Sequence, residues 1–307
     1  MDSLVRNKTK IQRIKQKQRL FNDVKAWIWL LPLVIALYLM VWRPTVIGVV
    51  WSFFKMKGYS PEGFIGFKNF IEVMSDTEFL PTMLNSLEYV VLSLIVGFVP
   101  PVIIAVMINE MVHFKNGFKL VTYLPALIPG VAVSLMWYYM YYPDSTGLLN
   151  MVLNALGLES YEWLMDGRFT ILYIIISMTW NGAPATMLLY FSALQGINTE
   201  LYEAAVIDGA GMFKKFWNVT LPQLGGVLLL NFVNQIIGVF QVMEQPMAMT
   251  GGGPNNASTT VGYQIYKYGF VGGRAGHALA LSVITFVILM VMTAFYFKLE
   301  KKVSENY

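Results

Sequence analysis

One apolar run near residue 235 carries small and amide-bearing residues at steps of three and four: Asn231, Asn234, Gln235, Gly238, Gln241 and Gln245. On a helix, this spacing places them on one face. Each amide can both donate and accept hydrogen bonds, which suits the binding of a solute rich in hydroxyl groups, such as a sugar. The same face could instead bond to a helix of a neighbouring subunit. The spacing leaves both interpretations open.

A second candidate group, Trp180, Asn181 and Gly182, lies in the middle of another apolar run. The indole could stack on the face of a sugar ring, or it could fill a helix interface. The pattern of a reaction centre is missing, since the chain has no cysteine and its histidines, His113 and His277, lie far apart. We therefore predict no catalytic residue, no metal site and no enzyme activity, and a membrane-embedded enzyme is the least supported hypothesis.

The composition indicates which elements must position these groups. Of the 307 residues, 56% are hydrophobic and 13% are charged, whereas about 25% of a soluble domain is charged. A bilayer needs about 20 apolar residues for each helical span. The sequence therefore predicts an all-α integral membrane protein with six transmembrane helices, near Ala26–Trp51, Leu84–Ile108, Leu120–Tyr142, Phe169–Ile197, Val219–Met243 and Ala278–Phe297.

The orientation follows from the lysines and arginines in the loops. Most of them fall in a basic tail over residues 1–25, in alternate loops and in a tail over residues 298–307. Because positive residues are retained in the cytoplasm, both termini are predicted to be cytoplasmic, with a transmembrane permease-like domain over residues 26–297 between them. The basic tail could also bind anionic lipid headgroups. The net charge of +4 comes from this clustering and argues against a nucleic-acid partner.

Prolines and isolated charges interrupt several of the predicted spans. Proline inside a helix frees a carbonyl and bends the helix, so kinks are expected at the pair Pro100-Pro101 and between Pro125 and Pro129. Arg43 lies inside the first span, where it could reach an interface or pair with Glu88 in the second. The outer loop over residues 143–168 has apolar residues at helical spacing over 147–157, which predicts a short helix on the outer rim.

The loop over residues 198–222 lies on the predicted cytoplasmic side. Small residues leave room for a close approach by another protein, and Glu203 and Asp208 offer fixed charges. A short helix is predicted over Leu201–Ala210, ended by Gly209 and Gly211, with a second short helix leading to Pro222. The alternative is a helix–turn–helix linker that packs only against its own bundle.

This loop resembles the EAA loop of permease subunits in ABC importers. It has Glu203-Ala204-Ala205, Gly209 and Leu221-Pro222 at the family's spacing, with Val219 where the family has Ile. The resemblance extends over nearly the whole chain. The stretches 66–70, 85–86, 194–197 and 250–254, and Tyr266 with Phe270, are similar to the sugar-importer branch, which includes the maltose and glycerol-3-phosphate permeases.

The resemblance implies a type I ABC importer permease fold in a bacterial cytoplasmic membrane. It implies four kinds of partner: a second homologous permease, two ATPase subunits, an extracellular solute-binding protein and the bilayer. The ATPase-coupling residues would be Glu203, Ala204, Ala205, Asp208, Gly209, Leu221 and Pro222. The residues matching sugar-contacting regions are Asn181, Gly182 and Gln235, which supports a carbohydrate pathway, for an oligosaccharide in particular.

The subunit that hydrolyses ATP is expected to be another chain. The sequence has no Gly-x-x-x-x-Gly-Lys-Ser/Thr loop, so ATP and Mg²⁺ would be bound by the partner ATPases and no cofactor by this chain. A stand-alone secondary transporter driven by an ion gradient is the main alternative. Such proteins usually show inverted repeats and buried ionisable residues, and both are scarce here.

Overall fold

Long helices form from the apolar runs, because every backbone polar group inside a bilayer needs a hydrogen-bond partner within the protein. The computed structural model describes residue 23 and residues 25–304, with side chains up to residue 298. The predicted role of the basic tail therefore falls on residues that lie mostly outside this description. Within it, five helices are long and apolar enough to span a membrane: Lys25–Trp51, Phe79–Glu110, Thr170–Gln195, Met212–Phe240 and Ala275–Lys298.

The span predicted near Leu120–Tyr142, with kinks expected at Pro125 and Pro129, is broken rather than kinked. The chain forms α6 (Lys115–Tyr123) and a 3₁₀ turn, η3 (Leu124–Leu127), and α7 (Gly130–Met140) follows at 91°. Pro125 cannot donate a helical hydrogen bond, and Ile128, just before Pro129, is extended, as residues before proline usually are. Six spans remain compatible with the structure if this bent pair counts as one.

The other spans keep their predicted positions, and the first, second and fifth each contain a wider, π-helical turn. The first contains η1 (Tyr38–Trp42) and α2 (Arg43–Trp51). The second consists of α4 (Phe79–Leu92), η2 (Ser93–Gly97) and α5 (Val99–Glu110), so its break lies just before Pro100. The remaining spans contain α9 (Thr170–Gln195), η4 (Phe216–Thr220) with α12 (Leu221–Phe240), and α15 (Ala275–Ser304).

The bundle has two hydrophobic clusters. One lies among α4, α9, α12 and α15 and contains the fully buried Tyr89 and Ile174. The other joins α5, α9 and α12 through residues such as Ile108, Met187 and Leu224. Together they fix the angle between α9 and α12, the helices that carry the polar candidates of the sequence analysis.

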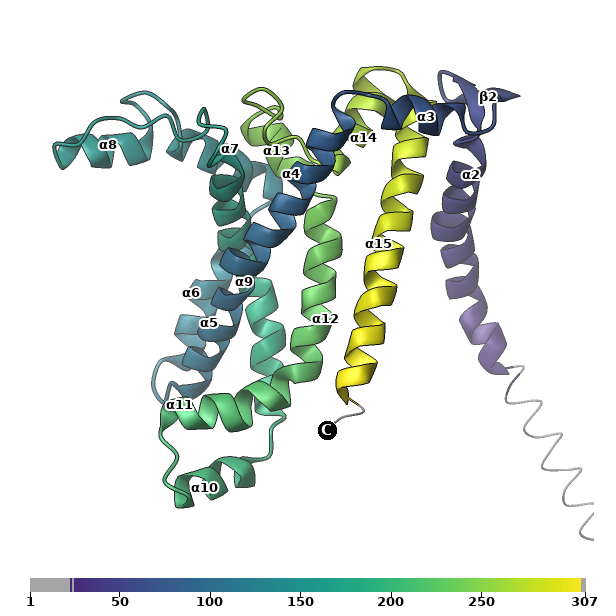
Figure 1. Cartoon of the computed structure of the whole chain (residues 1–307). Coiled ribbons are helices and arrows are strands. Elements are labelled where there is room, and N and C mark those ends of the chain that lie inside the picture. Colours follow the sequence, from purple (N-terminus) through teal and green to yellow (C-terminus); the bar gives the residue numbers. More distant parts are fainter. Residues whose placement is uncertain (1–22, 24, 305–307) are drawn as a thin grey trace, which may run out of the picture.

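The shorter elements gather at the ends of the bundle (Figure 1). One end carries the antiparallel hairpin β1 (Phe54–Lys57) and β2 (Ser60–Phe64), with α3 (Lys68–Met74), α13 (Glu244–Met249), α14 (Val261–Tyr266) and η5 (Lys267–Val271). The predicted rim helix is present there as α8 (Leu148–Ala155), which extends sideways. The opposite end carries α10 (Thr199–Ile207) and α11 (Met212–Lys215), beside the end of α15.

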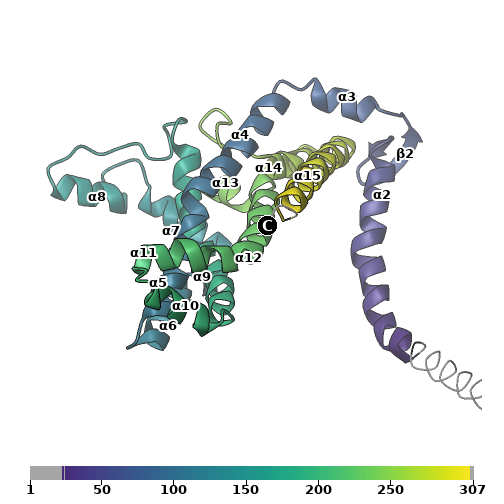
Figure 2. The ribbon, with the colours of Figure 1, turned by 60° about the horizontal axis from the view of Figure 1, so that its bottom comes forward.

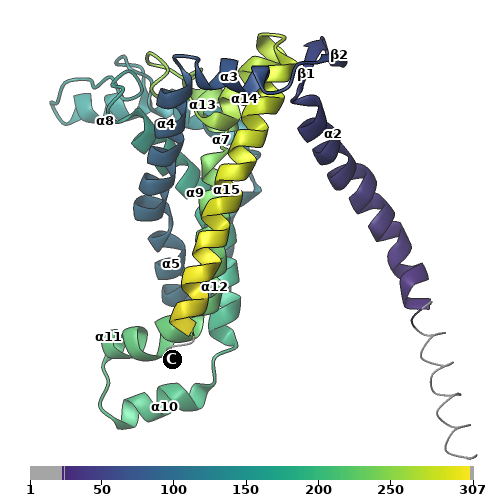
Figure 3. The same ribbon diagram turned by 45° about the vertical axis from the view of Figure 1, so that its right-hand side comes forward.

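The first spanning helix stands apart from the bundle (Figures 2 and 3). The most apolar window of Lys25–Trp51 is 0% buried, and α2 approaches α15 where Gly48 lies near Leu279. Among the described residues no ion pair joins Arg43 to Glu88, so the possible pairing considered from the sequence is not formed. This helix carries a large apolar surface that the rest of the chain does not cover.

Candidate functional site

Local hydrogen bonds shape the loop over residues 198–222. Asn198 caps α10 by accepting a hydrogen bond from the backbone N–H of Glu200 at 3.0 Å. At the other end, the N–H of Gly209 bonds to Val206 at 3.0 Å and the N–H of Ala210 to Ala205 at 2.8 Å. This pair of bonds is a Schellman motif, and it requires the left-handed backbone of Gly209, whose φ is +73°. The helix thus ends at Ile207, slightly earlier than predicted.

The loop contacts its own bundle through a hydroxyl pair. Tyr202 Oη lies 3.1 Å from Thr220 Oγ1, which links α10 to the π-helical turn η4. Leu221 and Pro222 begin α12 directly after that turn, so the N–H that proline lacks falls where the helical ladder is already widened. The chain is therefore helical without a break from α11 to the end of α12, and α10 is attached to this long helix.

The far side of the loop is exposed. Glu203, Ala204 and Asp208 are exposed, and Ala205 is half-buried. Large apolar side chains stand beside them, with Ile207 86% and Phe213 80% exposed. Exposed large apolar groups gathered on one surface usually mark an interaction site.

A cavity of about 310 Å³ opens among η2, α5, α9 and α12. It brings together four of the predicted pathway residues, Gly182, Asn231, Asn234 and Gln235. The lining contains hydroxyl and amide groups but no charged side chain; all its residues are Ser93, Gly97, Pro101, Ile175, Met178, Thr179, Gly182, Ala183, Thr186, Asn231, Asn234, Gln235 and Val239. This chemistry suits an uncharged, hydroxyl-rich solute.

Several predicted pathway amides are already bonded to backbone carbonyls. Gln235 Nε2 donates to the Ser93 carbonyl at 2.7 Å, and Asn181 Nδ2 donates to the Pro125 carbonyl at 2.7 Å, beside the break before α7. Asn231 and Gln241 donate to carbonyls four residues earlier in α12. These amides therefore satisfy irregular or exposed backbone, which is one of the requirements of a membrane interior.

Other polar groups of the cavity are free. Within the described part of the chain, Asn234, Thr179 and Thr186 make no side-chain hydrogen bond, and all of them line the cavity. Thr179 and Thr186 are not among the pathway residues predicted from the sequence. Their spacing of seven residues nevertheless puts them on the same face of α9 as Gly182. The free groups, rather than the whole amide stripe, are the best candidates for contact with a solute.

Trp180 and Gln241 lie outside this cavity. The Trp180 ring packs edge-on against Trp137 of α7 with centroids 6.1 Å apart, and Gln241 is exposed at the end of α12. The described residues hold no group of three or more side chains able to bind a metal ion. The carboxylate of Glu244 lies against Gly130 at the start of α7, where a helix N-terminus favours negative charge.

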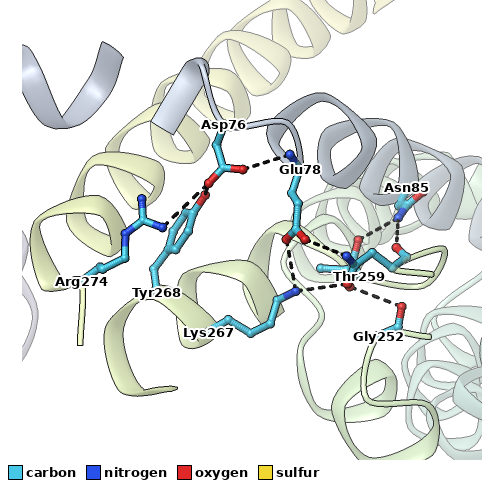
Figure 4. Close-up of polar contacts among 9 residues, drawn as sticks. Asp76, Glu78, Asn85, Gly252, Thr259, Lys267, Tyr268 and Arg274 are labelled. Atoms are coloured by element: carbon cyan, nitrogen blue, oxygen red, sulfur yellow. Dashed lines mark hydrogen bonds and ion pairs between the residues drawn. The ribbon is translucent and has the colours of Figure 1, made fainter. Parts of the chain in front are cut away.

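We call the end of the bundle that carries the β-hairpin the outer end, after its predicted orientation. There, a polar clamp joins the segment between α3 and α4 to the segment around η5. We define the clamp as Asp76, Glu78, Lys267, Tyr268 and Arg274 (Figure 4). Tyr268 donates to Asp76 at 2.7 Å, Arg274 lies 3.9 Å from the same carboxylate, and Lys267 lies 3.6 Å from Glu78. Burial would raise the pKa of Asp76. Bonds from Tyr268 and from the Glu78 N–H, together with the Arg274 charge, outweigh burial and hold that pKa below its ordinary value.

The clamp continues into the glycine-rich loop over residues 250–259. Asn256 donates to Glu78 at 2.8 Å, and Asn85 of α4 donates to the carbonyls of Asn256 and Thr259 at 2.9 and 3.1 Å. Ser86 accepts a bond from the N–H of Val261 at 2.8 Å. The residues 85–86 that carry part of the family resemblance therefore hold this loop on α4.

The family and the relatives that this chain matches are all membrane components of transport systems. Residues 89–305 match the family described as "Binding-protein-dependent transport system inner membrane component". A protein of Bacillus subtilis named as a probable ABC transporter permease, YurN, is 32% identical over 290 residues, covering 93% of this chain and 99% of that protein. The trehalose/maltose transport system permease MalF of Thermococcus litoralis is 30% identical over 274 residues, covering 89% and 92%.

Solved structures match over a similar length. A chain of a bacterial ABC transporter involved in import of the acidic polysaccharide alginate is 27% identical, with a TM-score of 0.82, covering 93% of this chain and 99% of that one. A second structure of the alginate transporter, in complex with a pentasaccharide-bound periplasmic protein, matches with 26% identity and the same TM-score, covering 93% and 97%. The predicted resemblance and the all-α membrane fold are confirmed.

Proposed function

Since this chain belongs to the family of binding-protein-dependent transport system inner membrane components, we propose that it forms half of the translocation pathway of a carbohydrate ABC importer. The curated relatives include permeases named for trehalose/maltose and for arabinooligosaccharides. The uncharged lining of the cavity supports a neutral sugar, such as a neutral oligosaccharide, with Asn234, Thr179 and Thr186 as its first contacts.

The second half of the pathway would come from a homologous permease. The apolar first helix, Lys25–Trp51, has no buried residue in its most apolar window and stands apart from the bundle. Packing of the helix on a second permease explains both features.

The ATPase subunits would act on the loop over residues 198–222. Its exposed carboxylates and the apolar pair Ile207 and Phe213 form a surface that an ATPase subunit can grip. The observation that carries the proposal is the connection of that surface to the cavity: α10 bonds to η4, and η4 continues into α12, whose polar face lines the cavity. Two ATPase subunits would bind the ATP and Mg²⁺, and this chain would need no cofactor and catalyse no reaction.

The remaining assignments concern the surroundings of the complex. An extracellular solute-binding protein would deliver the sugar to the end that carries the clamp, as a periplasmic protein binds the alginate importer. Both termini and the coupling loop over residues 198–222 would lie in the cytoplasm of a bacterial cell. In Figure 1 this loop lies at the same end of the molecule as the end of α15. The chain would cross the cytoplasmic membrane several times.

Uptake by a defined complex tests this function. Proteoliposomes containing the chain, its copurified partners and the binding protein should accumulate neutral oligosaccharide only when ATP is enclosed with the ATPases. Asn234→Ala should raise the half-saturating sugar concentration roughly fivefold, because one uncompensated hydrogen bond is lost. Uptake by this chain alone, abolished by an ionophore, would instead indicate a secondary transporter.

A further inference from the structure

The side chain of Gln235 crosses from α12 to the π-helical turn η2 of the second span. Its Nε2 donates to the Ser93 carbonyl at 2.7 Å, and both residues line the cavity. Gly97 permits this approach, since a Cβ there would lie 3.0 Å from Thr179 Oγ1 and 3.1 Å from Gln235 Nε2. Three spans therefore meet around one side-chain amide.

The backbone that begins at Ser93 is irregular. A π-helical turn over Ser93–Gly97 disturbs the regular hydrogen-bond ladder, and the prolines at the start of α5 leave the carbonyls of Val96 and Gly97 without a helical donor. Such breaks in membrane helices persist where a neighbouring side chain or cavity water satisfies the freed groups. Gln235 provides such a bond to the Ser93 carbonyl.

The same helix begins at the coupling loop. Tyr202 of α10 bonds to Thr220 in η4, and α12 continues from Leu221 to Phe240 without interruption. A push on α10 therefore moves α12 along its whole length. Any shift of α12 away from α4 lengthens the Gln235–Ser93 bond and leaves the carbonyl without its donor.

We propose that the Gln235–Ser93 hydrogen bond is a latch, which holds α12 against the second span while the cavity is empty and is replaced by a hydroxyl group of the transported sugar when α12 moves. A hydroxyl suits this exchange because it can donate to the Ser93 carbonyl and accept from Gln235 at the same time. The latch rests on the proposed function. It adds to that function a residue, Gln235, that makes the movement of α12 depend on the solute. Gln235 is a positioning residue in this scheme.

The test measures ATP hydrolysis by the reconstituted importer with and without sugar-loaded binding protein. Gln235→Met keeps an unbranched side chain of similar length but removes the donor. Without sugar, hydrolysis by this variant should rise roughly fivefold, because a closed state that has lost one net hydrogen bond is populated less. A residue that only supports the fold would lower hydrolysis in both conditions.

A matched variant isolates the bond. Gln241→Met changes the same residue type at the end of the same helix, but the Gln241 amide bonds to Ile237 within α12, so hydrolysis without sugar should stay at the wild-type value. If Gln235→Met fails to assemble, Gln235→Asn replaces it, because its amide is one methylene shorter and cannot keep the 2.7 Å contact.

The outcomes separate the latch from the function it rests on. Normal stimulation of the wild-type complex by sugar, with unchanged sugar-free hydrolysis in the Gln235 variant, would overturn the latch alone. A wild-type complex whose hydrolysis never responds to sugar-loaded binding protein would overturn the proposed function and the latch together.

Discussion

The two ends of the molecule differ in the contacts that hold their loops. At the outer end, the glycine-rich loop over residues 250–259 is held by α4 and by the clamp around Asp76 and Glu78. At the inner end, the coupling loop is shaped by bonds within itself and reaches its bundle through Tyr202 and Thr220. The outer loop is thus fixed to its own bundle by several side-chain contacts, whereas the inner loop presents exposed apolar side chains such as Ile207 and Phe213.

The difference also lies in the range of the contacts. The clamp joins residues far apart in sequence, such as Asp76 and Tyr268, which lie 192 residues apart. The cap at Asn198 and the Schellman motif at Gly209 use neighbours only a few residues away. Local bonds keep α10 rigid, and the contact between Tyr202 and Thr220 links this rigid helix to the bundle.

The largest expected effect comes from breaking the rigid inner loop. Gly209→Asp places a side chain at φ +73°, a backbone conformation that favours glycine, and it adds a negative charge to the surface that the ATPase would contact. Uptake of labelled sugar should fall at least about tenfold while the amount of protein in the membrane is unchanged. Gly211→Ala is the matched control, because Gly211 has a φ of −69° and should transport normally. Equal transport by both variants would contradict the coupling role.

A smaller effect is expected at the outer end, on stability rather than on coupling. Asp76→Asn weakens the bonds to Tyr268 and Arg274, so the free energy of unfolding should fall by about 1 kcal/mol, with uptake largely kept. Glu159→Gln, a change at an exposed outer acid, should leave stability unchanged. Thermal unfolding of the purified complex measures both.

The same carboxylate sets a pH dependence. Its pKa in the folded protein is lowered, so the contribution of Asp76 is fully present above the ordinary pKa of 3.8 and is lost as the pH falls through the folded pKa. In Asp76→Asn this acid-dependent loss should be absent. Identical acid profiles for the variant and wild type would show that the clamp does not act through this group.

The smallest effect should come from the link between the inner loop and the bundle. Tyr202→Phe removes the hydroxyl that contacts Thr220 and keeps the ring, so uptake should fall roughly twofold. Tyr59→Phe loses a comparable hydroxyl contact, to the Gly269 carbonyl at the outer end, and should change uptake less. A larger loss in Tyr59→Phe would reverse the comparison of the two ends.

The sequence predicted the elements well wherever apolar runs or local motifs decide the structure. The spans, the rim helix and the short helix of the coupling loop all follow from periodicity and caps. The break before α7 was missed because Pro125 and Pro129 were read as kinks, whereas together with extended Ile128 they turn the chain by 91°. Successive prolines with an extended residue between them leave no helical ladder to continue.

The candidate site was predicted less completely. The amide face of α12 does reach the cavity, but the sequence could not show that Gln235 bonds to Ser93 or Asn181 to Pro125, because those carbonyls belong to other helices. Thr179 was overlooked for the same reason: its free hydroxyl matters only beside α12. Long-range pairing of this kind leaves no local period in a sequence.

The most direct measurement of the central claim is the identity of the protein that covers Ile207. The chain has no cysteine, so Ile207→Cys can carry a single photo-reactive maleimide in intact membranes, with Ser160→Cys at the exposed outer end as the control. Mass spectrometry should identify a nucleotide-hydrolysing subunit cross-linked to position 207 and none cross-linked to position 160. Cross-links from position 207 only to lipid or to this chain's own bundle would contradict the account.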